Sequence, residues 1–502
     1  MSSNLASTSL NWIVFLCAVI PMLYLGLHAR GVAESGEDGF LMGGRSLGWF
    51  VGSSTVVATG YSGWGFMGAT QVCYSFGPIE LLANLGFATA HVMAAIFFAT
   101  RLRAQAQDYG SLTVPEYVAR GHASNENEHR MIQGVGGLAT WLCLIIFIVG
   151  QIRGVGALCA PWLDISPELA AVIVMAIVIF YTAFGGLSAV AWTDTFMVMG
   201  MLVGTIWICI VIGQEYSLNE FWTAYSQQYP ELYNPDTAAP YGVFKTNAFL
   251  TVPYAFMFAA ILPYMAVRFM AFKDGTNFRA VAIPIAVMSL ILSLLPVVGC
   301  YVAMKNPGMK DSAEAMSWFL KNIMSPLPEA IITLFILFSM KSTINSLLHT
   351  TSSALTHDMR VAATQKDLTV DKESQRKALT FNRWGVIFCG CIGLGLTYLA
   401  PAYFLNYFAY LGTGTLQAVL CGPVFLGAFW RGNTYGAIAS MIVGGVVSAS
   451  FLTIHPDIGW IVGPLLGDLF GCLTYVIVSI WTFSKSRPPK KAIRGDEAPA
   501  AA

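Results

Sequence analysis

The sequence has few charged residues for its length. Only 11% of its 502 residues are Asp, Glu, Lys or Arg, whereas soluble globular proteins contain about 25%. Lysine plus arginine equals aspartate plus glutamate, at 27 each, so there is no net positive charge to attract a nucleic acid. The hydrophobic share is 56%. These values exclude a soluble multidomain protein and a nucleic-acid binder, and they predict a membrane protein with many spans.

Motifs for metals, redox centres and nucleotides are also missing. The ten cysteines lie almost all in hydrophobic runs, and their only close pair, Cys389 and Cys391, lacks the spacing of a zinc or redox site. The histidines are scattered and form no ligand set. No phosphate-binding loop is present, which argues against transport driven directly by ATP. The sequence therefore does not predict an enzyme.

Long apolar runs recur from residue 10 to residue 484, each long enough to cross about 30 Å of hydrocarbon as a helix. Thirteen spans are predicted, at 10–28, 48–77, 78–100, 131–160, 167–184, 188–213, 246–270, 279–304, 326–356, 380–400, 403–430, 435–454 and 458–483. The predicted fold class is an all-α polytopic membrane protein with about 13 transmembrane helices. Residues 1–10 lack the basic residues of a secretory signal, so the first span is predicted to be retained.

The basic residues predict an orientation. Twenty-one of the 27 lysines and arginines fall in segments on one side of the spans, and four fall on the other. Cytoplasmic loops are enriched in these residues, so the richer side is assigned to the cytoplasm. The C-terminus is then cytoplasmic and the N-terminus outside, in a multi-pass protein of the cell inner (plasma) membrane. Arg153 and Lys341 lie inside spans.

Two predicted spans contain residues that interrupt a helix. Residues 58–68 read ATGYSGWGFMG, and their four glycines weaken helical structure. Residues 246–270 carry Pro253 and Pro263, which each remove an amide donor and clash with the preceding turn. A pair of interrupted spans is typical of a transporter with a binding site near the bilayer midplane. Close packing of helices at glycines is the alternative explanation.

The span 326–356 carries Lys341 near its centre, where a charge is costly and needs a partner or water. Short oxygen-bearing side chains surround it. At 100° per residue, one stripe about 100° wide holds four of them: Ser339, Ser342, Thr343 and Ser346. This stripe predicts a cation site, with hydrogen bonding between helices as the alternative. Lys341 lies about 150° from the centre of the stripe but only about 40° from Asn345.

Short motifs along the chain resemble those of the sodium:solute symporter family. In chain order they are 41–48 (LMGGRSLG), 62–64 (SGW), 181–186 (YTAFGG) with 192–195 (WTDT), 268–271 (RFMA), 341–345 (KSTIN), and Gly432 with 436–437. The sodium/pantothenate and sodium/proline branches are the most similar. The resemblance implies a leucine-transporter-type fold that works by alternating access, with Na+ as the coupling ion.

The resemblance also divides the chain into segments. It implies an extra helix and a first cytoplasmic loop at 1–47, a five-helix repeat at 48–213, an extracellular loop at 214–245 and an inverted five-helix repeat at 246–430. Two more helices follow at 431–484, and a disordered cytoplasmic tail is expected at 485–502.

The resemblance further implies two ion sites. The main sodium site would take oxygens from five residues: Ala58, Tyr61, Ser339, Ser342 and Thr343. A second site, present in some family members, would take Asp194, Asn345 and Ser346, although a carboxylate at a helix N-terminus is the alternative for Asp194. Lys341 departs from the proline carriers, which have an apolar residue there. We predict that Lys341 pairs with Asp194 or another buried acid and replaces a second cation or titrates during transport; a lysine extending through a polar crevice is the alternative.

The expected solute site combines both interrupted spans. Ser62 and Trp64 would contact the solute together with Gln151 and Arg153, because an arginine fork suits a carboxylate. Glu80 would either contact the solute or pair with Arg153. The second interrupted span offers Tyr254, Phe256, Phe258 and Tyr264. Phe256 is the one predicted to contact the solute, and small alanines beside it leave room for a solute larger than proline.

The sequence thus predicts sodium-coupled symport of a small organic solute, a carboxylate or amino acid of the pantothenate or proline type. The alternatives are a proton-coupled or sodium-independent transporter in which Lys341 replaces a cation, a membrane solute sensor, and a cation channel. Apart from the solute and membrane lipid, no obligate protein partner is expected.

Overall fold

The computed structural model describes residues 2–364, 372–399 and 409–486. Over these residues the chain is helical; no strand is present, and one isolated β-bridge joins Leu47 to Phe272. Most of the predicted tail at 485–502 lies outside the described residues. The described part of the chain therefore has the predicted all-α architecture.

The long helical runs form the body of the molecule. They are α1 (Ser2–His28), α6 (Ile79–Met93) continued by η3 (Ala94–Ala99) and α7 (Thr100–Tyr109), α9 (Glu126–Leu163), α10 (Pro167–Glu215), α15 (Phe278–Leu292) with α16 (Val297–Lys305), α18 (Pro326–Ser353) continued by η6 (Ala354–Met359) and α19 (Arg360–Thr364), α20 (Lys372–Leu399), η7 (Tyr410–Gly414) continued by α22 (Thr415–Leu420), η8 (Cys421–Leu426) and α23 (Gly427–Phe429), α24 (Thr434–Ile454) and α25 (Val462–Trp481).

Shorter helices connect or interrupt these runs. They are α2 (Arg30–Ala33), α3 (Glu37–Met42), η1 (Gly43–Arg45), α4 (Trp49–Gly60), η2 (Trp64–Gly68), α5 (Ala69–Phe76), α8 (Val114–His122), α11 (Leu218–Gln228), α12 (Pro230–Tyr233), η4 (Lys245–Leu250), α13 (Thr251–Ile261), α14 (Pro263–Met270), η5 (Ser312–Glu314), α17 (Ala315–Ile323) and η9 (Pro456–Ile458).

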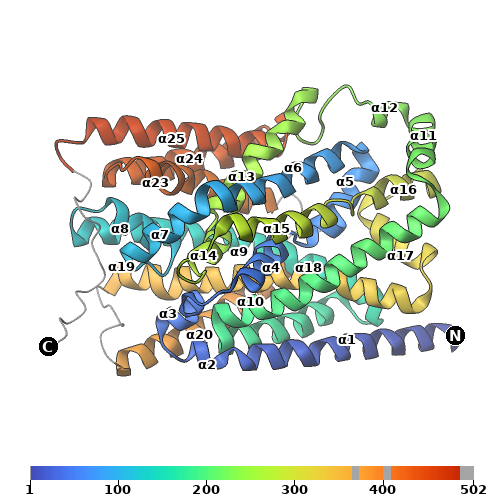
Figure 1. Ribbon diagram of the computed structural model, residues 1–502, viewed down its shortest axis with the longest axis horizontal. Coiled ribbons are helices and arrows are strands. Elements are labelled where there is room, and N and C mark those ends of the chain that lie inside the picture. The colour runs from blue at the N-terminus through green and yellow to red at the C-terminus, as the bar shows by residue number, and fades with distance from the viewer. Residues whose placement is uncertain (1, 365–371, 400–408, 487–502) are drawn as a thin grey trace.

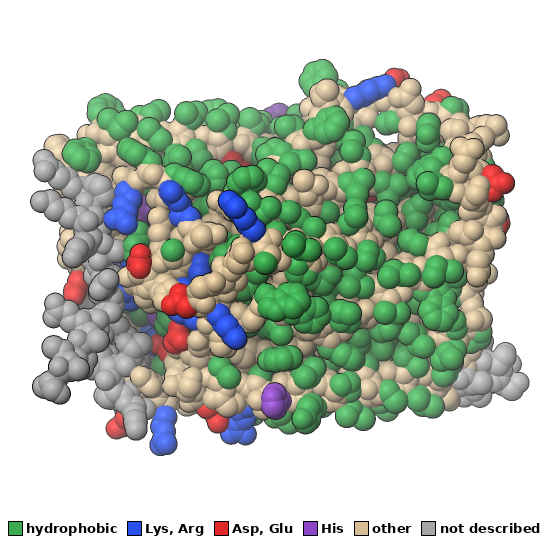
Figure 2. All heavy atoms as spheres, viewed as in Figure 1, with side chains coloured by type: hydrophobic (Ala, Val, Ile, Leu, Met, Phe, Trp, Pro, Cys, Tyr) green, Lys and Arg blue, Asp and Glu red, His purple; other side chains and the backbone are tan. Residues whose placement is uncertain are grey.

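The helices run mostly along one axis of the molecule. The start of α1 and the end of α25 lie at opposite ends of this axis (Figure 1). On the visible face, charged side chains gather at the end that holds α3, α7 and α8, while the middle of the face is mostly hydrophobic (Figure 2). This distribution suits a bundle whose middle faces lipid.

Ten helices of the described residues are long and apolar enough to span a membrane, or eleven if the bent pair α13 and α14 counts as one. The 49 residues of α10 would extend about 73 Å, more than twice the hydrocarbon thickness. Its backbone turns at Gly186 (φ 52°, ψ −149°), where a Cβ atom would stand 2.4 Å from the carbonyl oxygen of Phe40. α4 and α5 are each shorter than a span. The count of thirteen therefore stays a prediction.

Both predicted interruptions are present. α4 ends at Gly60, Tyr61 leaves helical geometry at φ −87° and ψ 83°, and the π-helical turn η2 follows. In the second interruption the helices Lys245–Ile261 and Pro263–Met270 are bent by 58°. Pro263 is the first residue of α14, where a missing amide costs no helical bond.

Pro253 does not break its helix, and this part of the prediction is wrong. It is the third residue of α13, in the first turn, where the amide of any residue would lack an intrahelical acceptor.

α18 is the central helix of the bundle. Of its most apolar window, 89% is buried, against 28% for α1. It packs against α1, α4, α9, α10 and α20, which surround it. Both the hydroxyl stripe and the lysine of this helix are therefore inside the protein.

Candidate functional site

The break after α4 meets the hydroxyl stripe of α18. The Ser342 hydroxyl lies 2.8 Å from the carbonyl oxygen of Ala58 and 2.9 Å from that of Ser339. The Thr343 hydroxyl lies 3.4 Å from the carbonyl oxygen of Thr59 and 3.3 Å from that of Ser339. All five residues are buried. The structure thus brings together four of the five residues predicted for the main sodium site and adds Thr59.

Tyr61, the fifth predicted residue, caps the end of α4 at the same break. Its hydroxyl points to α15, where it lies 2.8 Å from the Ser293 hydroxyl and donates to the Ser289 carbonyl at 3.0 Å. Only the backbone oxygen of Tyr61 is therefore placed to serve a cation at the break.

A buried ion pair lies next to these hydroxyls. One carboxylate oxygen of Asp194 is 3.4 Å from Nη2 of Arg268, 2.6 Å from the Thr55 hydroxyl and 3.3 Å from the Thr59 hydroxyl. Arg268 also donates to Thr55 through Nε at 2.9 Å and to the hydroxyl of Ser346. Both charged side chains are completely buried. The pair joins α4, α10, α14 and α18 at one point.

This pair corrects two sequence interpretations. The twenty-one basic residues counted on the cytoplasmic side include Arg268, but Arg268 is buried among helices. The remaining twenty still outnumber the four on the other side. Asp194 lies eight residues past the Gly186 turn and two helical turns into its half of α10, so it is not an N-terminal carboxylate.

The residues predicted for a second cation site separate. Ser346 stays with Asp194 because both contact Arg268 and Thr59. Asn345 instead accepts a hydrogen bond from the Tyr181 hydroxyl. Arg268 is part of the RFMA motif, so the sequence marked it as a residue of interest. The motif does not indicate that Arg268 contacts Asp194, because the two residues lie on different helices.

Lys341 does not pair with Asp194. Its ammonium nitrogen lies 3.8 Å from the sulfur of Met22 in α1, and the side chain is completely buried. Among the described residues it has no acidic partner within ion-pair distance. The predicted pairing fails because Lys341 leaves α18 on the side that faces α1, while Arg268 supplies the positive charge at Asp194.

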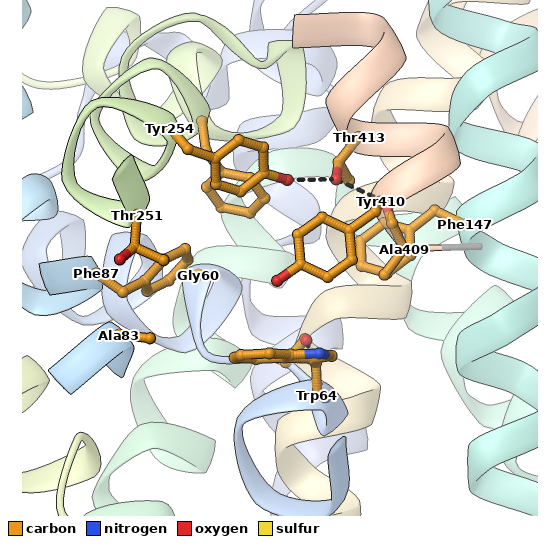
Figure 3. Close-up of a pocket in the computed structure, with 12 residues that line it drawn as sticks. Gly60, Trp64, Ala83, Phe87, Phe147, Thr251, Tyr254, Ala409, Tyr410 and Thr413 are labelled. Carbon is orange, nitrogen blue, oxygen red and sulfur yellow. Dashed lines mark hydrogen bonds between the residues drawn. The ribbon is translucent and has the colours of Figure 1, made fainter. Parts of the chain in front are cut away.

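An aromatic pocket lies on the other side of the α4 break. Its lining residues are Gly60, Ser62, Trp64, Ala83, Phe87, Phe147, Thr251, Tyr254, Phe258, Ala409, Tyr410 and Thr413. Trp64, Phe87, Tyr254 and Tyr410 surround a common space (Figure 3). No lining residue carries a formal charge.

Ser62 and Trp64 occupy the predicted position at this pocket, but Phe256 does not. Phe256 packs edge-on against Phe425 with ring centroids 5.7 Å apart, while Phe258, two residues later, lines the pocket. On a helix a shift of two residues rotates a side chain by about 200°, so the prediction for Phe256 is wrong and Phe258 takes that place.

The predicted Glu80–Arg153 pair does not form. Glu80 is completely buried and accepts hydrogen bonds from Asn84 and from Tyr241 of the loop before α13. Arg153 is partly exposed and has no ion pair among the described residues. Gln151 is buried, and its amide oxygen lies 3.3 Å from where a Cβ of Gly63 would stand. Gln151 therefore lies at the break.

Sequence reasoning missed most walls of the pocket. Phe87, Phe147, Tyr410 and Thr413 come from three helical runs far apart in the chain. In an apolar span an aromatic residue that lines a site resembles one that faces lipid or core, so no local signal identifies it.

Comparison with known proteins decides the family. The model of the sodium:solute symporter family matches residues 40–444. The chain belongs to the sodium:solute symporter family. Among curated relatives, the osmoregulated proline transporter OpuE of Bacillus subtilis is 25% identical over 95% of this chain and 95% of its own. The sodium/proline symporter 2 of Staphylococcus saprophyticus is 24% identical over 87% of this chain and 85% of its own.

Two solved structures share the fold. A Na+-coupled sialic acid symporter in an outward-open state has a TM-score of 0.75 at 16% identity and covers 96% of this chain and 99% of its own. A nucleobase-cation-symport-1 family transporter has a TM-score of 0.54 at 15% identity over 89% of this chain and 95% of its own. The leucine-transporter-type fold is thereby confirmed. The chain is a membrane-embedded symporter that couples Na+ to a small organic solute, and it is not an enzyme.

Proposed function

We propose that Na+ and solute bind on opposite sides of the one backbone break between α4 and η2. The observation that carries this proposal is that different residues of the segment 58–64 face the two sites. The carbonyls of Ala58 and Thr59 meet the hydroxyls of α18, while Gly60, Ser62 and Trp64 line the aromatic pocket. A cation that orders this backbone also orders the wall of the solute pocket, which is the physical requirement for coupling.

The main sodium site would use the oxygens of Ala58, Tyr61, Ser339, Ser342 and Thr343. These are hard oxygen donors, and interrupted helices supply such carbonyls to coupling ions. At Asp194 and Ser346 the positive charge is already supplied by Arg268. A second sodium ion would have to displace that guanidinium, so coupling to one Na+ is favoured.

The solute is proposed to be a small zwitterion of the amino-acid type. No lysine or arginine lines the pocket, which disfavours a solute with only a negative charge, such as one of the pantothenate type. Amides freed at the break suit a carboxylate, and aromatic faces suit an ammonium group. Glu80, one helical turn from Ala83 and without a basic partner among the described residues, places a carboxyl group behind the pocket.

Two unpaired polar groups near the break support this site. The indole N–H of Trp64 and the side-chain amide of Gln151 are buried without hydrogen-bond partners in the described residues. Unsatisfied buried polar groups are costly, and a bound solute would satisfy them. The curated relatives named as proline transporters are consistent with a zwitterionic solute. Arg153 is not proposed to contact the solute.

The orientation and the repeats remain proposals. The N-terminus is placed outside and the C-terminus in the cytoplasm of the inner (plasma) membrane, since the basic residues favour this and the two ends of the described chain lie at opposite ends of the bundle. The inverted repeats are placed at 48–213 and 246–430, so that each contains one interrupted helix.

Uptake into proteoliposomes tests the solute class. With a sodium gradient, an imino acid, its N-methylated betaine and a carboxylate without an amine are compared, and sodium and proton gradients are imposed separately. Uptake of the zwitterions alone, driven by sodium, is expected. Trp64→Leu should weaken binding by about 2 kcal/mol, roughly thirtyfold, through the lost aromatic contact. Trp49→Leu is the control, because Trp49 lies at the start of α4, before the break, and is 61% exposed. Equal uptake of the carboxylate without an amine would overturn the proposed solute class.

A further inference from the structure

A chain of alternating charges closes the end of the bundle that is assigned to the cytoplasm. His357 of η6 stands between two carboxylates: its Nδ1 is 3.1 Å from Glu37 of α3, and its Nε2 is 3.1 Å from Glu116 of α8. Arg360 donates to Glu37 at 3.0 Å, and Nε of Arg120 donates to Glu116 at 2.9 Å. These contacts link three segments that are distant in the sequence.

The geometry determines the charge of the imidazole. Ionised carboxylates only accept hydrogen bonds, so both ring nitrogens of His357 must carry hydrogen, as in the imidazolium. The resulting order is Arg360, Glu37, His357, Glu116 and Arg120, with charges that alternate along the chain. The side chains of His357 and its two carboxylates are at most 5% exposed. Water does not screen these contacts as it screens surface ion pairs.

The two carboxylates respond to this environment in the same direction. Burial raises the pKa of Glu37, but the charges of His357 and Arg360 outweigh it, and the net pKa is lowered. Burial likewise raises the pKa of Glu116, and Arg120 and His357 together lower it below its usual range. Both glutamates are therefore ionised at neutral pH while the chain of charges is intact.

Polar side chains of α18 and η6 lie between this chain of charges and the sodium site. Along α18 and η6, Ser346, Thr350, Ser353 and His357 follow at intervals of four, three and four residues, so they share one helical face. A cavity beside this face is lined in part by Thr113, Thr140, His349, Thr350, Ser353 and Asp358. Asp358, which lines this cavity, accepts hydrogen bonds from Thr113 at 2.5 Å and from Gln133 at 2.9 Å. Hydroxyl and carboxylate oxygens of this kind suit a hydrated cation.

We propose that His357 is a positioning residue for transport, which holds α3, α8 and the end of α18 together as the inner gate. Na+ leaves the hydroxyl stripe through the polar cavity only when the contacts of His357 with Glu37 and Glu116 separate. The π-helical turn η6 sets the register that places His357 and Asp358 at the gate. The inference does not depend on which solute is carried.

The gate is expected to respond to pH in both directions. The groups that face His357 are Glu37 from α3, Glu116 and Arg120 from α8, His129 from α9, and Asp358 and Arg360 from its own segment. Both glutamates have lowered pKa values in the closed gate. Their contribution to the stability of the closed gate is therefore present above their ordinary pKa of 4.5 and is lost as the pH falls below it. Raising the pH until His357 loses its proton removes the bridging charge, so closure also weakens on the alkaline side.

Cysteine labelling tests the gate without any solute. Ser353→Cys is treated in inside-out membrane vesicles with an impermeant maleimide, and the labelled peptide is measured by mass spectrometry. His357→Gln should increase the labelling rate about tenfold, because a bridge between two carboxylates is lost. Glu34→Gln is the matched control, since Glu34 pairs with Arg30 and Arg383 on the same end of the molecule but is 39% exposed; its labelling rate should not change.

A second variant protects the test from a folding defect. Glu37→Gln keeps a hydrogen-bond acceptor and should give an intermediate rate, and the double variant should be no faster than His357→Gln alone, because both act through one contact. Monodispersity in detergent verifies folding. Equal labelling of all variants, additive effects of the two substitutions, or labelling only from the opposite face of the membrane would overturn the proposal.

Discussion

The two sides of α18 carry polar groups at the same depth, but their surroundings differ. On one side, Ser342, Thr343 and Ser346 meet backbone carbonyls, a threonine hydroxyl and a guanidinium. On the other side, the polar contact of Lys341 is the sulfur of Met22. Both sides are buried, so burial alone does not distinguish a site from its surroundings.

The difference follows from the helices that α18 meets. The hydroxyl side faces α4 and α14, which both adjoin a break in the backbone and so present groups outside regular helical bonding. The lysine side faces α1, which continues as one helix for 27 residues although it contains Pro21, so most of its amides and carbonyls bond to each other. Polar side chains become a site where they meet a helix that is interrupted.

The largest effect is expected from Arg268→Ala, which removes one partner of the buried pair on the hydroxyl side. Asp194 would be left buried without its countercharge, at a cost of about 3–5 kcal/mol in unfolding free energy, and sodium-driven uptake should be lost. Thermal unfolding in detergent and uptake in proteoliposomes measure the two effects. Arg279→Ala, at an exposed position, is the control. Wild-type stability in Arg268→Ala would show that the pair does not hold α10, α14 and α18 together.

A smaller effect is expected from Ser342→Ala. The substitution removes one hydroxyl from the proposed sodium site without unpairing a charge, so the sodium concentration for half-maximal uptake should rise about tenfold. Ser352→Ala is the matched control, because its hydroxyl donates only to the His349 carbonyl of the same helix, at 2.8 Å. If both variants needed the same sodium concentration, the hydroxyl stripe would be structural.

The smallest effect on transport is expected from Lys341→Met. Methionine fills similar volume, and no acidic partner of Lys341 is left unpaired, so coupling to sodium should be unchanged. Stability should rise by about 1–3 kcal/mol, since a buried amine without a matched partner is removed. Uptake is measured against sodium and proton gradients separately. Loss of sodium coupling, or a new dependence on protons, would restore the coupling role that the sequence suggested for this lysine.

The local pattern of the sequence was sufficient for the class of protein, both helix breaks and the hydroxyl stripe. Each depends on residue type and periodicity within one segment: glycines at 60–68, Pro263 at a helix start, and hydroxyls on one side of α18. The partners of Lys341, Asp194 and Glu80 could not be obtained in this way. Their pairing depends on how helices distant in the sequence are rotated against each other. A shift of two residues exchanges Phe256 for Phe258 at the pocket, and the positive charge at Asp194 comes from Arg268 of α14 instead of Lys341 of α18.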